Sequence, residues 1–240
     1  MRAPCCADDP IGKVQAEDRE EYRMKGLLRD HFYAAYANGK SLVRILFVAG
    51  IAIVAVYPKE ALIRYYMLLC LIMISFVALP AFGKDGSCRW ERYKLTMPVT
   101  RADIVRSCYV GQFLWMFAGI LLSGGAVVLS VLLHGFLFDR STDVWLIYVM
   151  GVSISLFMGA IFYPLSCLCG EEAKGASLVG STFLAVAIVI GLAMLWNFLF
   201  GPVMAPAMIL LGGAVILLCA LAVYAGSFFL TVGIFRRKEY

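Results

Sequence analysis

Residues 207–235 read AMILLGGAVILLCALAVYAGSFFLTVGIF, a stretch without a single charged residue. A bilayer core about 30 Å thick needs about 20 apolar residues in an α-helix, and this stretch exceeds that length. Four further apolar stretches also reach it, at residues 62–82, 108–133, 144–168 and 177–200. The chain is 62% hydrophobic with a mean hydropathy of +0.85, far above a soluble domain. The sequence therefore predicts an all-α polytopic membrane protein.

A sixth span is predicted at residues 41–57, where Arg44 is expected to extend toward the end of the span. Six spans place both termini on the same side of the membrane. Eighteen of the 21 Lys and Arg residues then lie on that side, and three, Lys59, Arg64 and Arg140, lie on the other. Basic loops stay in the cytoplasm. Both termini and residues 83–107 are therefore predicted to be cytoplasmic, in a bacterial plasma membrane. The net charge of +5 then reflects loops beside anionic lipid and not nucleic-acid binding.

Two segments precede the first span. Residues 1–23 are polar, lack the apolar run of a signal peptide, and are expected to be a solvated extension. Residues 24–38 (MKGLLRDHFYAAYAN) carry apolar side chains near a helical period, which favours an amphipathic helix in the inner membrane interface. A cytoplasmic extension of the first membrane helix is the alternative. For Cys5 and Cys6, palmitoylation, metal binding and unused thiols all remain open.

The longest charged connection is residues 83–107, between the second and third spans. Trp90 and Tyr93 are three residues apart and share one helix face. Pro98 ends that helix, and Thr100 with Asp103 resembles a capping box. The loop is therefore expected to form a short amphipathic helix, a break, and a second helix that enters the third span. Anchoring in the membrane interface and docking of a cytosolic partner are equally compatible with these residues.

The sequence lacks the residues that several functional classes of membrane protein require. No Asp, Glu, Lys or Arg lies in the central part of the longer spans, where ion-coupled transporters place charge. Residues 151–153 (GVS) are faintly similar to the site of intramembrane serine proteases, but no histidine lies in a later span to act as the base of Ser153. The sequence holds no metal cluster, phosphate loop or dinucleotide fingerprint. An ion-coupled secondary transporter and a membrane-embedded enzyme are therefore the weaker alternatives. Glycine pairs at 124–125 and 212–213 predict close helix packing.

Residues 90–105 (WERYKLTMPVTRADIV) resemble the signature of small ABC-2 type permeases, which reads roughly W-x-x-Y-x-x-x-L-P-[VI]-[ST]-R-x-x-[IV]-V. Met97 replaces the usual Leu. Three shorter matches lie in register: residues 24–28 (MKGLL), Pro164-Leu165 followed by Gly170 and Lys174, and residues 238–240 (KEY). Glu171 and Glu172 depart from the family, which carries more basic residues there. The resemblance covers residues 24–240 as one six-helix permease domain.

This resemblance implies the transmembrane subunit of an ATP-driven exporter, with a fold of the ABC-2, type V exporter kind. The chain would have no ATPase site or cofactor of its own. It would pair with a second permease, identical or related, and with two copies of an ABC ATPase that binds ATP and Mg. The family includes exporters of phenol-soluble modulins and some bacteriocins, which implies an amphipathic or hydrophobic substrate, a peptide. It implies no substrate-binding residues. The role of coupling to the ATPase is carried over to Trp90, Arg92, Tyr93, Pro98, Arg101 and Asp103.

Overall fold

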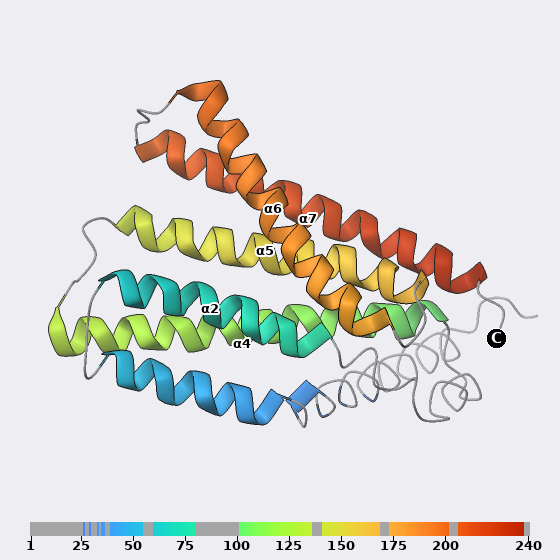
Figure 1. The fold of residues 1–240 in the computed structure, drawn as a ribbon, viewed down its shortest axis with the longest axis horizontal. Helices are drawn as coiled ribbons and strands as arrows, with labels where there is room; N and C mark the ends of the chain where they lie inside the picture. The colour runs from blue at the N-terminus through green and yellow to red at the C-terminus, as the bar shows by residue number, and fades with distance from the viewer. Residues whose placement is uncertain are drawn as a thin grey trace, which may run out of the picture.

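The computed structural model describes residues 39–54, 60–79, 101–135, 141–168, 173–201 and 206–237, with Gly26, Arg29, Tyr33, Ala35 and Tyr36. These parts are almost entirely helical. A first helical segment, 39–54, is followed by α2 (Glu60–Ala78), α4 (Arg101–His134), α5 (Ser141–Leu168), α6 (Lys174–Phe200) and α7 (Pro206–Arg237). The helices form a bundle along one common direction, with α6 crossing α5 and α7 at an angle (Figure 1).

Five of the helices are long and apolar enough to cross a membrane, judged by length and composition. Each overlaps one of the five longer spans expected from the sequence, so the prediction of an all-α polytopic membrane protein is confirmed. Segment 39–54 is shorter, and residues 55–59 lie outside the described part, so the sixth span stays a prediction. The polar extension 1–23 also lies outside it. Within 24–38 the five described residues are helical, and the choice between an interfacial helix and an extension of the first span stays open.

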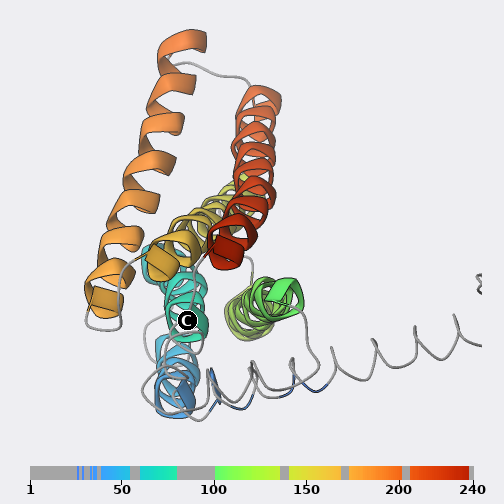
Figure 2. The ribbon, with the colours of Figure 1, turned by 90° about the vertical axis from the view of Figure 1, so that its right-hand side faces the viewer.

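Helix α5 is the centre of the bundle. It contacts α2, α4, α6 and α7, and every residue from 153 to 160 is buried. A helix that is buried on all sides needs small residues to let its neighbours approach. Gly151 and Gly159 meet this need, because a Cβ at either position would collide with Leu71 of α2 or Gln112 of α4. The end-on view in Figure 2 shows α5 between α6 and α7.

Segment 39–54 runs antiparallel to α2 and in the same direction as α4. At one end Gly39 abuts the side chain of Val77. Further along, the Tyr66 hydroxyl donates a hydrogen bond to the Leu46 carbonyl at 2.9 Å. At the other end, His134 Nε2 lies 2.9 Å from the carbonyl oxygen of Val54. The first two contacts set the position of the segment along α2, and the third sets it along α4.

Three of the four glycines in the predicted packing pairs lie in close contacts. Gly212 of α7 abuts the Trp196 ring of α6, and a Cβ at Gly213 would lie 3.5 Å from Leu146 of α5. A Cβ at Gly124 would lie 3.3 Å from the Tyr148 hydroxyl. Gly125 is the exception, since a Cβ there would meet nothing within 4 Å.

Candidate functional site

The residues expected to couple the chain to an ATPase lie at and before the start of α4. Trp90, Arg92, Tyr93 and Pro98 fall outside the described residues. Arg101 is the first residue of α4, and Asp103 lies in its first turn, where an acidic side chain is favoured by the helix dipole. Helix α4 then continues without interruption to His134, so the predicted helix that follows Pro98 and enters the third span is confirmed.

A buried cluster of polar side chains follows two to three turns after Arg101 and joins α4 to α5 and α7. We call it the tyrosine cluster; its members are Tyr109, Gln112, Tyr163, Tyr224, Ser227 and Thr231. The Tyr109 hydroxyl lies 2.9 Å from Ser227 Oγ and 2.9 Å from Thr231 Oγ1. The Tyr224 hydroxyl lies 3.0 Å from the Tyr109 carbonyl and 3.1 Å from Gln112 Oε1. Four hydrogen bonds thus tie α7 to α4.

Gln112 extends the cluster to α5. Its Nε2 donates to the Ser155 carbonyl at 2.9 Å, while its Oε1 accepts from Tyr224. Gly159 provides the room, because a Cβ there would overlap the Gln112 amide. The Ser155 hydroxyl in turn pairs with the Ser75 hydroxyl of α2. A single amide therefore bridges three helices, and a serine pair links a fourth.

A proline in α5 determines which hydroxyls of the cluster donate and which accept. Pro164 has no N–H, so the carbonyl four residues earlier, that of Ala160, loses its usual helical partner. Ser227 Oγ of α7 donates to this carbonyl at 2.6 Å. Since a carbonyl can only accept, the Ser227 proton is committed to the Ala160 carbonyl and the Thr231 proton to the Ser227 carbonyl at 2.8 Å. The single Tyr109 proton is therefore shared between Ser227 Oγ and Thr231 Oγ1 as acceptors. The hydroxyls thus form a chain from α4 through α7 to α5.

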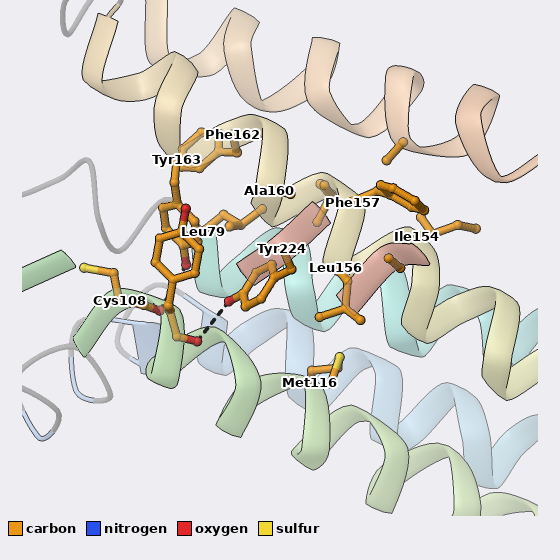
Figure 3. Close-up of a cluster of buried hydrophobic side chains, with 14 of the residues drawn as sticks. Leu79, Cys108, Met116, Ile154, Leu156, Phe157, Ala160, Phe162, Tyr163 and Tyr224 are labelled. Carbon is orange, nitrogen blue, oxygen red and sulfur yellow. Dashed lines mark hydrogen bonds between the residues drawn. The ribbon is translucent and has the colours of Figure 1, made fainter. Parts of the chain in front are cut away.

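The rings of the cluster pack tightly against one another. The centroid of Tyr109 lies 4.5 Å from that of Tyr163 and 4.9 Å from that of Tyr224, with Phe228 edge-on at 5.4 Å. The Tyr163 hydroxyl donates to the Cys108 carbonyl at 3.1 Å. Figure 3 shows Tyr163 and Tyr224 pointing toward α4, with apolar side chains such as Phe162 beside them. Ring contact and hydrogen bonding therefore act on the same three helices.

The cluster can hold helices together but offers little for catalysis. Its polar groups are hydroxyls, one amide and carbonyls, and each hydrogen bond described above satisfies a group that would be costly to bury alone. Among the residues that the structure describes, no three His, Cys, Asp or Glu side chains gather as a metal site. The cluster therefore links α4, α5 and α7 through buried hydrogen bonds.

Sequence reasoning missed this cluster. The absence of charge in the spans was noted, but the uncharged polar residues were not placed. Two signals were present. Gln112 is the one glutamine within a predicted span, and Tyr224, Ser227 and Thr231 are spaced by three and four residues, which puts them on one helix face.

Comparison with known proteins identifies the family of the chain. The family profile described as ABC-2 family transporter protein matches residues 26–236. The chain belongs to the ABC-2 transporter family. No curated protein and no solved structure matches it significantly. As an ABC-2 permease it is a multi-pass membrane subunit of an ABC transporter, in a family that works with an ABC ATPase and whose members typically have no ATPase site of their own.

Proposed function

We propose that this permease is the transmembrane subunit of an ABC exporter in a bacterial plasma membrane. It couples ATP hydrolysis by a separate ATPase to the export of an amphipathic or hydrophobic peptide. The observation that carries the coupling role is α4, an unbroken helix from Arg101 to the tyrosine cluster and beyond. Its first residue belongs to the segment expected to dock on the ATPase.

The transmission path is short. From Arg101 to Tyr109 is eight residues, about 12 Å of helix, and Gln112 lies about 4 Å further on. Because Tyr109 and Gln112 tie α4 to α5 and α7, a displacement of its cytoplasmic end moves all three helices together. Discrete shifts of packed helices are a common way to switch a membrane protein between two states.

The assembly is proposed to contain two ATPase subunits and two permeases, identical or related. Both termini and residues 83–107 face the cytoplasm, as the distribution of Lys and Arg favours. This places the N-terminal end of α4 on the side where ATP is available. In the partner contact, Trp90 and Tyr93 fill a groove of the ATPase, and Arg92, Pro98, Arg101 and Asp103 shape its edge.

An apolar substrate is supported by the composition of the spans. No acidic or basic residue lies in the central part of the five longer spans, and the tyrosine cluster uses its polar groups within the protein. A pathway lined by such helices can bind the apolar face of a substrate without burying an unpaired charged side chain of the protein. A small ion or a sugar needs carboxylates or many free hydrogen-bonding groups at mid-depth.

The test is ATPase activity of the permease reconstituted with its partner ATPase in liposomes. Amphipathic peptides, lipids and small hydrophilic solutes are added in turn. Amphipathic peptides are expected to stimulate hydrolysis, and hydrophilic solutes are expected to leave it at the basal rate. Stimulation by the hydrophilic solutes alone would overturn the proposed substrate class.

A further inference from the structure

A narrow apolar groove of ≈ 340 Å³ lies between segment 39–54 and α4. Phe47, Ile51 and Leu121 are exposed at its edges. Gly125 is exposed as well, and a Cβ there would meet nothing within 4 Å, so the missing side chain widens the groove. Every lining residue is apolar: Phe47, Gly50, Ile51, Leu121, Leu122, Gly125, Ala126 and Leu129. The groove therefore suits a slender apolar chain.

Two basic side chains continue the same stripe of segment 39–54. Lys40, Arg44, Phe47 and Ile51 are spaced by four, three and four residues, so they share one helix face. Arg44 is seven residues from Ile51, which is about 10 Å along the axis. Both cations are exposed. In the described part of the chain no carboxylate pairs with either of them; the ion pair found there joins Arg64 to Glu60.

Both cations lie beside the apolar part of α2. Lys40 follows Gly39, which abuts Val77 near the end of α2, and Arg44 is two residues from Leu46, which accepts a hydrogen bond from Tyr66. Arg44 therefore lies beside the part of α2 between Val77 and Tyr66, and α2 is long and apolar enough to span the membrane. An exposed charge at such depth is costly without a counter-charge. Helical side chains slant toward the N-terminus of their helix, so both charges extend toward the nearer membrane surface.

We infer that this groove and the two cations bind an anionic phospholipid of the adjacent leaflet. Its phosphate lies against Lys40 and Arg44, and one acyl chain occupies the groove. The charges favour a lipid over a second copy of this chain. The acidic residues that the structure describes, Glu60, Asp103 and Asp143, all lie in the first turns of helices, far from the depth of Arg44. The lipid supplies the negative charge and the apolar chain together.

The test measures lipid binding to the purified full-length chain. The protein is delipidated in detergent and titrated with palmitoyl-oleoyl phosphatidylglycerol or the matching phosphatidylcholine, and bound lipid is counted by native mass spectrometry. We expect phosphatidylglycerol to bind about tenfold more tightly. The double variant Lys40→Gln/Arg44→Gln should abolish this preference, while Arg106→Gln, an exposed cation of α4 outside the stripe, should keep it. Because Lys40 and Arg44 are exposed, the double variant is expected to fold.

The groove is tested separately by Gly125→Leu, with Gly191→Leu as the control because Gly191 of α6 is also exposed and free of neighbours within 4 Å. Filling the groove should weaken both lipids about equally, and the control should weaken neither. Equal affinity of the wild-type chain for the two lipids, or an intact preference in the double variant, overturns the inference. Disulfide cross-linking of Phe47→Cys between copies in membranes, abolished by Gly125→Leu, also overturns it and assigns the groove to a dimer contact.

Discussion

Replacing Ser227 with alanine removes the hydroxyl that pairs with the Ala160 carbonyl at 2.6 Å. Pro164 has already deprived that carbonyl of its helical donor, so the substitution leaves a buried acceptor unpaired. An unpaired buried group costs about 1–3 kcal/mol, whereas hydrogen bonds in membrane proteins average about 0.6 kcal/mol because the unfolded state finds other partners. We therefore expect Ser227→Ala to lower the free energy of unfolding by about 1–2 kcal/mol, a factor of about 5–30 in the equilibrium.

Pro164→Ala provides the decisive partner variant. Alanine at 164 restores an N–H that can donate to the Ala160 carbonyl within α5. The cost of Ser227→Ala should then fall by about 1 kcal/mol, which appears as a coupling energy in a double-mutant cycle. Ser181→Ala is the matched control. Ser181 is also fully buried, but its hydroxyl donates to the Leu178 carbonyl within its own helix at 2.9 Å.

The assay is reversible unfolding of the permease in mixed micelles with increasing sodium dodecyl sulfate, followed by far-ultraviolet circular dichroism. Equal costs of Ser227→Ala with and without Pro164 would contradict this pairing, since the Ala160 carbonyl would then have another partner. A loss of stability in Ser181→Ala as large as in Ser227→Ala would refute it too, because burial of any serine would explain the result.

Three further predictions concern coupling, packing and topology. Trp90→Ala or Tyr93→Ala should weaken capture of the partner ATPase by affinity purification, at a cost of about 2 kcal/mol or more for a buried aromatic anchor, whereas a mere interface anchor would leave the yield normal. Gly159→Ala should lower thermal stability by about 1–3 kcal/mol because its methyl group overlaps the Gln112 amide, whereas Gly180→Ala, with no neighbour within 4 Å, should not. Single cysteines introduced in 83–107 should stay unlabelled by an impermeant thiol reagent in intact cells, and labelling from outside would reverse the topology.

The long helices were predictable because membrane thickness acts directly on sequence. A helix must hold about 20 apolar residues to cross the bilayer, so apolar stretches as long as residues 62–82 and 207–235 predict membrane-spanning helices. The start of α4 was predictable for a local reason, since a proline at 98 disfavours helix just before it and Asp103 favours the first turn of a helix that follows. Apolar length and the residues at a helix start depend only on residues close together in the chain, so both can be read directly from the sequence.

The tyrosine cluster was not predictable to the same degree. Its hydrogen bonds join Tyr109 to Thr231 and Gln112 to Ser155, so they depend on how α4, α5 and α7 rotate about their axes. In a soluble protein an apolar stripe would reveal that rotation. Here lipid-facing and buried sides are both apolar: Phe183 of α6 is 74% exposed, and Phe162 of α5 is 1% exposed. Without that contrast, the polar residues of a span cannot be assigned to partners from sequence alone.

The same ambiguity hid the groove beside segment 39–54. Arg44 is predicted to extend toward the membrane surface, and this stays a prediction. The spacing of Lys40 and Arg44 is visible in the sequence, but the groove that their stripe continues depends on Gly125, where a Cβ would meet nothing within 4 Å. The neighbouring Gly124, in contrast, packs against Tyr148. A glycine pair in the sequence therefore marks two different features, a contact and a gap.

ATP hydrolysis by a partner ATPase is proposed to drive transport through this permease. The most direct measurement is accumulation of a fluorescently labelled amphipathic peptide inside inverted proteoliposomes that contain the permease with or without its ATPase. We expect accumulation only when the ATPase and hydrolysable ATP are both present, and none with a non-hydrolysable analogue. Accumulation by the permease alone, driven by a proton or sodium gradient without ATP, would contradict it and identify an ion-coupled transporter.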